Sequence, residues 1–172
     1  GTHALTVALF GILRPGDFVL SVSGMPYDTL HGVIYGEGNG SLKDFGVMFE
    51  CLPLTPEGKM DLKKAEQRIE ALGNRLKMVY IQRSRGYELR DAFSVEEIGE
   101  VCARVRACGF TGCIFVDNCY GEFVEKKEPC DVGGDIAVGS LIKNPGGGLA
   151  PTGGYVVGKK EYVELIGRRL TA

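Results

Sequence analysis

Short apolar runs alternate along the chain with segments in which apolar residues recur every three or four positions. The runs cover residues 18–22, 47–52, 78–81 and 113–116. Turn-forming residues bound each of them, so each predicts a buried strand. The intervening segments predict amphipathic helices. Alternation of this kind is typical of an α/β fold, so we predict a largely parallel sheet with helices on both faces.

Cap residues and chain breakers mark the ends of the predicted helices. Ser94 stands three positions before Glu97, which is the spacing of a capping box, and Asp61 is a suitable N-cap for another helix. A further helix starts the chain, a short one runs towards Tyr35, and a final one is predicted over residues 159–170. Each of the predicted strands therefore has a helix next to it in the sequence.

The stretch 135–158 carries two apolar runs on either side of a lysine and a glycine-rich loop. Residues 136–138 and 155–157 are predicted strands, and Ser140 and Lys143 follow the first of them. No helix long enough for a crossover fits between the two strands, so we predict an antiparallel last strand and a mixed sheet. Glycines let the backbone approach a bound group closely, so Lys143 is expected at a strand end beside open space. On its own, a lysine beside a glycine loop is also typical of a solvated surface.

The composition indicates a single domain. With 172 residues and 44% hydrophobic residues, the chain can bury one sizeable core without disulfides or a metal. The net charge of −2 and the scattered Lys and Arg residues leave no basic surface for nucleic acid. No apolar run approaches the roughly 18 residues that span a bilayer, and no signal sequence starts the chain. We therefore expect a cytoplasmic protein with neither a nucleic acid nor a membrane partner.

The six cysteines and two histidines do not form a metal-binding pattern. None of the cysteines belongs to a C-x-x-C pair, and His3 and His31 lie far from most of them in the sequence. Several cysteines stand in apolar segments, as Cys113 does. We predict free thiols that fill the core in a reducing compartment, and no metal site.

Polar side chains follow the ends of three predicted strands. Ligands of open α/β sheets bind beyond the carboxyl ends of the strands, so these side chains are expected on one rim. The helix start at residues 1–4 adds free backbone N–H groups, which suit a phosphate. The predicted rim thus combines an acid, a lysine, a hydroxyl and an anion-binding helix end. Its side chains are Gln82, Arg83, Asp117, Asn118, Ser140 and Lys143.

Five sequence runs together resemble the pyridoxal phosphate enzymes of fold type I. The runs are Gly-Thr-His-Ala (1–4), Pro-Tyr-Asp-Thr-Leu (26–30), Ile-Gln-Arg-Ser-Arg-Gly-Tyr (81–87), Val-Asp-Asn-Cys-Tyr-Gly-Glu-Phe (116–123) and Ser-Leu-Ile-Lys-Asn-Pro-Gly-Gly-Gly (140–148). Within fold type I, the chain is similar to the cystathionine and methionine lyase group, and to its methionine γ-lyase-like family, often labelled aluminium resistance proteins. The resemblance covers essentially all 172 residues. It implies the large, cofactor-binding domain of such an enzyme.

The resemblance implies roles for four residues around the cofactor ring. Lys143 would form the Schiff base with the aldehyde of pyridoxal 5′-phosphate and later take the substrate α-proton, so its pKa should be lowered. Asp117 would pair with the pyridine nitrogen and keep the ring protonated. Gln82 would lie near the ring oxygen, and Asn118 would orient Asp117. Without the resemblance, Asp117 could be an ordinary N-cap or loop carboxylate.

The resemblance also implies how the phosphate and the ring face are held. Ser140 would bring a hydroxyl to the phosphate, and Gly1 and Thr2 match the helix start that binds the same group. Tyr27 would stack on the ring, although an aromatic residue at a helix start is also typical of the core. Better-known lyases have a second hydroxyl residue immediately before the lysine, where this chain has Ile142. Other groups must therefore hold part of the phosphate.

Fold type I enzymes have parts that residues 1–172 do not match. These are an N-terminal arm, a strand before the first helix, and a C-terminal small domain that usually carries the arginine for the substrate carboxylate. We therefore expect residues 1–172 to be a partial large domain from a longer protein. The strand at 155–157 would then be an open edge with unpaired backbone groups.

The function implied by the resemblance is β- or γ-elimination on a sulfur-containing amino acid such as cystathionine, methionine or cysteine. The alternatives are another reaction of the same cofactor, transamination or decarboxylation, because a fold does not determine the outcome. A third possibility is an inactive scaffold that binds cofactor weakly or not at all. By the same resemblance the protein would be a homodimer or homotetramer with sites completed across the subunit interface.

Overall fold

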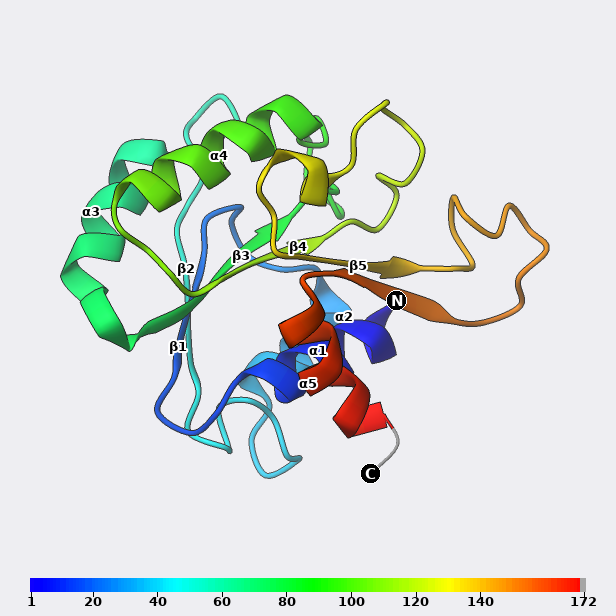
Figure 1. Cartoon of the computed structure of the whole chain (residues 1–172), viewed down its shortest axis with the longest axis horizontal. Coiled ribbons are helices and arrows are strands. Elements are labelled where there is room, and N and C mark those ends of the chain that lie inside the picture. The colour runs from blue at the N-terminus through cyan, green and yellow to red at the C-terminus, as the bar shows by residue number, and fades with distance from the viewer. Residues whose placement is uncertain (171–172) are drawn as a thin grey trace.

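A computed structural model describes residues 1–170 as a six-stranded sheet with helices on both faces (Figure 1). The strand order is β2-β1-β3-β4-β5-β6, and all neighbours are parallel except β5 and β6. The predicted α/β class and the mixed sheet are confirmed, with element ends within a few residues of expectation. In chain order the helices and strands are α1 (Thr2–Ile12), β1 (Phe18–Ser21), α2 (Asp28–Tyr35), β2 (Met48–Cys51), α3 (Leu62–Leu72), β3 (Leu76–Gln82), α4 (Val95–Ala107), β4 (Cys113–Asp117), β5 (Ile136–Ser140), β6 (Gly154–Gly158) and α5 (Lys160–Leu170).

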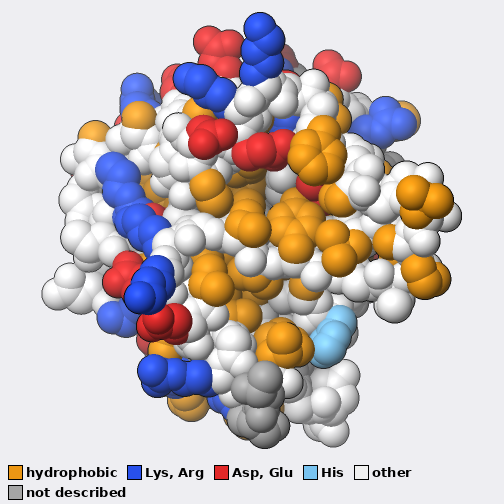
Figure 2. Space-filling model, turned by 45° about the vertical axis from the view of Figure 1, so that its right-hand side comes forward, with side chains coloured by type: hydrophobic (Ala, Val, Ile, Leu, Met, Phe, Trp, Pro, Cys, Tyr) orange, Lys and Arg blue, Asp and Glu red, His pale blue; other side chains and the backbone are white. Residues whose placement is uncertain are grey.

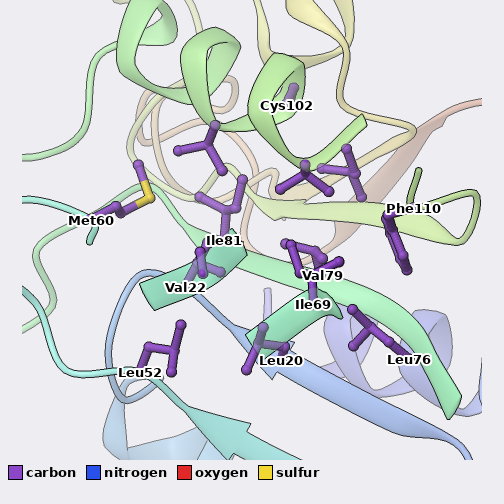
Figure 3. Packing of buried hydrophobic residues seen from close by; sticks show 14 of the residues in the cluster. Leu20, Val22, Leu52, Met60, Ile69, Leu76, Val79, Ile81, Cys102 and Phe110 are labelled. Atoms are coloured by element: carbon purple, nitrogen blue, oxygen red, sulfur yellow. The ribbon is translucent and has the colours of Figure 1, made fainter. Parts of the chain in front are cut away.

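The sheet separates two hydrophobic layers because successive side chains of a strand point to opposite faces. On one face, strand residues such as Leu20, Val79 and Ile81 pack against α3 and α4, as Figure 3 shows for Ile69 and Cys102. On the other face, α1, α2 and α5 cover the alternate strand positions. Each fully buried Leu or Ile side chain stabilises the fold by about 1.5–3 kcal/mol. One core on each face therefore keeps the central strands rigid at the rim where they end.

The predicted helix caps are confirmed. The Asp61 side chain accepts a hydrogen bond from the N–H of Lys64 at 3.0 Å and starts α3. Ser94 and Glu97 form both hydrogen bonds of a capping box at the start of α4. Gly73 ends α3 with a φ of 52°, a conformation that favours glycine.

Strand β6 forms an edge of the sheet, as predicted, and pairs only with β5 within residues 1–170. Figure 2 brings this side of the molecule forward and shows hydrophobic side chains gathered across the middle of the face. A cavity of about 440 Å³ lies there between α1, β6 and α5, lined by Ala4, Val7, Val156 and Val163 among others. The open edge therefore stands beside an apolar hollow.

Three further features of the described residues bear on the expectations. No helix among residues 1–170 is long and apolar enough to cross a membrane. In the same part of the chain, no group of three or more His, Cys, Asp or Glu side chains could hold a metal ion. All six cysteines are free, and Cys102, Cys113 and Cys119 are buried.

Candidate active site

The carboxyl ends of the central strands surround a small cavity. Its volume is about 200 Å³. Of the predicted site residues, Lys143, Asp117 and Tyr27 line it together, although they come from three distant parts of the sequence. The full lining is Tyr27, Asp28, Thr29, Ser84, Gly86, Tyr87, Asp117, Cys119, Tyr120 and Lys143. The structure thus places the predicted amine, acid and aromatic ring around one space.

Asp117 is the last residue of β4 and is only 1% exposed. Its Oδ1 accepts a hydrogen bond from the N–H of Cys119 at 3.1 Å, and its Oδ2 accepts one from the hydroxyl of Tyr80 at 3.4 Å. Burial raises the pKa of Asp117 above its usual value, and the donors and the nearby Lys143 offset only part of that rise. The carboxylate is therefore firmly oriented, and its negative charge would be stabilised by a cationic ligand group.

A tight loop after β5 carries Lys143. The Nδ2 of the next residue, Asn144, donates to the carbonyl oxygen of Tyr120 at 3.0 Å and so ties this loop to the one after β4. Gly146 makes the turn possible, since a Cβ at that position would overlap the carbonyl oxygen of Leu141. These contacts hold Lys143 beside the carboxyl end of β4.

The Nζ of Lys143 lies over the ring of Tyr120, 4.0 Å from its centroid. Partial burial works to lower the pKa of Lys143. Charge interactions with Cys119, Tyr120 and Asp117 outweigh burial, so the pKa is raised in this structure. The expectation of a lowered pKa is therefore wrong for the residues described. The physical reason is that the lysine's neighbours are groups that become anionic on losing a proton, which favours the ammonium form.

Thr2 and Gln82 are both hydrogen-bonded to Tyr27. The hydroxyls of Thr2 and Tyr27 share a hydrogen bond of 2.7 Å, and the N–H of Tyr27 donates to Oε1 of Gln82 at 2.8 Å. The Nε2 of Gln82 donates to the carbonyl oxygen of Ser84 at 3.1 Å. The amide of Gln82 is thus hydrogen-bonded on both sides, and the two residues fix the position of the Tyr27 ring at the cavity wall.

Ser140 and Gly1 lie side by side at the start of α1. A Cβ built on Gly1 would stand 3.3 Å from Cβ of Ser140 and 3.7 Å from its Oγ. The Oγ of Ser140 is buried and has no hydrogen-bond partner among the described residues. The first N–H groups of α1 have no partner within the helix either, and no side chain caps it. A free hydroxyl next to free N–H donors fits a phosphate group.

Asn118 is turned away from this cavity. It follows Asp117 along the chain, so its side chain points to the opposite face of the sheet. There its Oδ1 accepts from Arg83 at 2.9 Å, while its Nδ2 donates to Glu128 at 2.9 Å and to the hydroxyl of Tyr155 at 3.3 Å. The hydrogen bonds that orient Asp117 come from Tyr80 and Cys119 instead.

Among the site residues that the sequence-based prediction did not name, three contact Asp117 or Lys143 directly: Tyr80, Cys119 and Tyr120. Tyr80 stands two positions before Gln82 in the same strand, so alternation could have placed it on the site face. Cys119 stands two positions after Asp117, within reach of its carboxylate. Tyr120 could not be inferred, because its place over the lysine depends on a φ of 69°, which is uncommon for a non-glycine residue.

Comparison with known proteins identifies related sequences over the whole chain. The family model for methionine gamma-lyase matches residues 1–172. The uncharacterized protein YnbB of Bacillus subtilis is 50% identical over 175 residues, which cover 100% of this chain and 41% of that protein. L-methionine gamma-lyase of Treponema denticola is 28% identical over 96% of this chain and 37% of that protein.

Solved structures with the same fold include close sequence relatives. A carbon-sulfur lyase involved in aluminum resistance from Clostridium novyi superposes with a TM-score of 0.93 at 47% identity. The match covers 99% of this chain and 41% of that one. The chain thus spans about two fifths of the length of the relatives it matches.

Proposed function

Since the chain belongs to the methionine gamma-lyase family, we propose that it forms the cofactor-binding core of a carbon–sulfur lyase. The enzyme would use pyridoxal phosphate to eliminate a thiol from a sulfur-containing amino acid. The observation that carries the proposal is that Lys143 and Asp117 line one cavity. Two relatives, a carbon-sulfur lyase and an L-methionine gamma-lyase, support the reaction class.

The residues around the cavity fit this cofactor. The unpartnered hydroxyl of Ser140 and the start of α1 at Gly1 and Thr2 would hold the phosphate. Asp117 would accept a hydrogen bond from the ring nitrogen, because its buried carboxylate lines the cavity and forms no ion pair among residues 1–170. Tyr27 would lie against the ring, and its hydrogen bonds to Thr2 and Gln82 keep it in place.

Pyridoxal phosphate, when bound, supplies an electron sink that stabilises negative charge at the substrate α-carbon. The task of Asp117 is to hold a proton on the ring nitrogen, which its buried negative charge favours. The task of Lys143 is to take the α-proton at Nζ, so it must first lose its own proton. Its pKa is raised in this structure, so the neutral form requires a change in its surroundings, either fuller burial or a cationic neighbour.

The decisive experiment is to locate the cofactor. The product of the complete reading frame that encodes this chain would be incubated with pyridoxal phosphate, reduced with borohydride and digested. Mass spectrometry is expected to find the cofactor on the peptide that contains Lys143, and Lys143→Ala should abolish both the label and the near-visible absorbance band. Lys63→Ala, a change of an exposed lysine on α3, serves as the matched control. A label retained in Lys143→Ala would contradict the assignment.

The reaction type requires a product assay. Release of thiol together with a keto acid from cystathionine, methionine or cysteine is expected for elimination. A keto acid that keeps the sulfur would indicate transamination, and an amine with carbon dioxide would indicate decarboxylation. Either of the last two results would be consistent with pyridoxal phosphate as the cofactor and would contradict elimination as the reaction.

Assembly is part of the proposal, because the rim of the cavity has exposed apolar side chains. Tyr120, Phe123 and Val124 are each more than 60% exposed. Burying them against a second copy would stabilise a homodimer or homotetramer. Light scattering after size exclusion would give the mass. Equilibrium dialysis of residues 1–172 alone would show whether they bind pyridoxal phosphate by themselves or act only as a scaffold.

A further inference from the structure

Glu122 is a buried acid to which the proposed function assigns no role. It lies in the loop that follows β4, and it is 4% exposed. Its Oε2 is buried and has no hydrogen-bond partner among the residues that the structure describes. Burying a carboxylate oxygen without a donor costs free energy, so this side chain weakens the fold unless its other contacts offset that cost.

The other carboxylate oxygen of Glu122 contacts Tyr155 of β6. Its Oε1 accepts a hydrogen bond from the Tyr155 hydroxyl at 2.9 Å. Burial and the charge of Glu122 raise the pKa of Tyr155, so this hydroxyl stays protonated and remains a donor. The same hydroxyl accepts a hydrogen bond from Nδ2 of Asn118 at 3.3 Å. The hydrogen bond between Tyr155 and Glu122 thus joins the loop after β4 to the edge strand β6.

Gly139 provides the space for this carboxylate and its hydroxyl donor. It lies in β5, directly opposite Tyr155 in the antiparallel register. A Cβ at residue 139 would overlap both Oε1 of Glu122 and the hydroxyl of Tyr155. The Glu122 side chain therefore reaches the backbone of β5 at a point that only glycine leaves open.

The loop around Glu122 has an uncommon backbone conformation. Tyr120 and Phe123 have φ values of 69° and 63°, which residues with a Cβ rarely adopt. Such conformations persist only where surrounding contacts hold them, and the side chains of Tyr120 and Phe123 are exposed. The only side chain between them is that of Glu122, because residue 121 is glycine, and it is buried. Glu122 therefore supplies a fixed point within this segment.

The same segment holds the loop that carries Lys143. The Nδ2 of Asn144 donates hydrogen bonds to the carbonyl oxygens of Tyr120 and Glu122, each at 3.0 Å. The Nζ of Lys143 lies 4.0 Å from the centroid of the Tyr120 ring. Cys119, one position earlier, lines the small cavity together with Lys143. The position of Lys143 thus depends on a segment that the Glu122 carboxylate fixes.

We propose that Glu122 is a positioning residue for Lys143 and acts through the loop after β4 and through Asn144. Its carboxylate fixes this loop against β5 and β6, and its carbonyl oxygen holds the residue next to the lysine. The inference rests on the proposed function only for the task that Lys143 has there. Glu122 itself contacts neither the substrate nor the cofactor in this proposal.

The pKa of Lys143 in the cofactor-free product of the complete reading frame tests the proposal. The ¹³Cε NMR signal of labelled lysine gives this pKa, and its loss in Lys143→Arg assigns the signal. Interactions with Cys119, Tyr120 and Asp117 raise the pKa of Lys143 more than burial lowers it. Glu122→Ala should loosen the segment that carries Cys119 and Tyr120. The pKa of Lys143 should therefore fall towards its ordinary value.

Two milder variants show whether the hydrogen bond between Glu122 and Tyr155 is responsible. Glu122→Gln keeps an oxygen that can accept from Tyr155 and removes the charge, so it should leave the pKa of Lys143 as in the wild type. Tyr155→Phe keeps the ring and removes the donor, so it should lower that pKa as Glu122→Ala does. Because both changes act on one contact, the double variant should lower the pKa no further than the larger single change. Tyr155→Phe also provides the test if Glu122→Ala does not fold.

A loss of stability alone is not expected to move the pKa of Lys143. Ile69→Ala, the matched control, opens a cavity in the core beside Leu76, at the amino end of β3 and so at the opposite edge of the sheet. It should lower the free energy of unfolding and leave the pKa of Lys143 unchanged. An unchanged pKa in both Glu122→Ala and Tyr155→Phe, or a fall of the same size in Glu122→Gln or Ile69→Ala, would overturn the proposal.

The titration of Lys143 needs no cofactor, so its outcome is independent of the proposed function. A wild-type protein that binds no pyridoxal phosphate would refute the proposed function, and the pKa of Lys143 in the variants would still decide the role of Glu122. Conversely, cofactor attached to Lys143 in the wild type, together with an unchanged pKa in Glu122→Ala and Tyr155→Phe, would refute only the role of Glu122.

Discussion

The hydroxyl of Tyr80 donates a hydrogen bond to Oδ2 of Asp117, across the boundary between β3 and β4. Tyr80 is fully buried, and its ring stacks on Phe115 with 5.5 Å between the centroids. Burial and the charge of Asp117 raise the pKa of Tyr80, so the hydroxyl stays protonated and remains a donor. The acid of the site is thus oriented by a residue that belongs to the core.

Tyr80→Phe should remove the hydrogen bond to Asp117 and keep the packing of the ring in the core. The ring packing stays, so we expect a loss of only about 0.5–1.5 kcal/mol in the free energy of unfolding. The pKa of Asp117 should rise further, because the ionised carboxylate loses a donor. A ¹³C NMR titration of the Asp117 carboxyl carbon measures this pKa. Tyr162→Phe removes a hydroxyl that makes no hydrogen bond among residues 1–170 and should not shift it. An unchanged pKa in Tyr80→Phe would show that the 3.4 Å contact is too weak to matter.

Asp117→Asn should stabilise the cofactor-free protein, and only at higher pH. Burial raises the folded-state pKa of Asp117, so the folded protein holds this proton where the unfolded chain has released it. The free energy of unfolding therefore falls as pH rises from the ordinary aspartate range through the raised pKa. Asn carries no charge, so its advantage should appear above that window and vanish below it. Urea denaturation across pH tests this, with Asp91→Asn at an exposed site as control.

Ser140→Ala should weaken phosphate binding without weakening the fold. Its buried hydroxyl has no partner among the described residues, so no hydrogen bond is lost and the free energy of unfolding should stay within about 0.5 kcal/mol. The affinity for pyridoxal phosphate, measured by equilibrium dialysis, should fall roughly 10-fold. Ser21 is equally buried but donates to the carbonyl oxygen of Gly24 at 2.7 Å. Ser21→Ala should instead cost about 1–3 kcal/mol. Equal losses in the free energy of unfolding of Ser140→Ala and Ser21→Ala would contradict the inference that the hydroxyl of Ser140 is free to bind phosphate.

Gly146→Ala should disturb the loop that carries Lys143. The new Cβ would overlap the carbonyl oxygen of Leu141, and backbone cannot move aside as a side chain can. We expect a loss of about 1–3 kcal/mol in urea denaturation and less cofactor attached to Lys143. Gly32 lies in α2, where an added Cβ would meet no other atom within 4 Å, so Gly32→Ala should stabilise by about 0.5–1 kcal/mol. Normal labelling of Lys143 in Gly146→Ala would refute this account of the loop.

The fold was largely predictable because its signals are local. The capping box at Ser94 and the cap at Asp61 each depend on residues three positions apart. The antiparallel course of β6 followed from the missing crossover helix before it. These features depend on chain geometry within a few residues, so one sequence is enough to find them.

The finer features of the site depend on contacts between distant segments. Periodicity placed Asp117 at a strand end, yet the direction of Asn118 required the alternation of β4 to be followed one residue further. Partial burial lowers the pKa of Lys143, and interactions with Cys119, Tyr120 and Asp117 raise it by more. The approach of Cys119 and Tyr120 depends on the backbone conformation after β4. Propensity and spacing carry no information on such charge interactions.

The alternation that sends Asp117 to one face and Asn118 to the other has a use in engineering. Chemical reactivity lies on the face of α1, while the charged cluster of Arg83, Glu125 and Glu128 lies on the face of α4. Substitutions in the core that α3 and α4 cover could tune thermal tolerance, and those on the other face could redirect selectivity, with little interference between the two. A directed-evolution library could therefore be divided along the plane of the sheet and each half screened on its own.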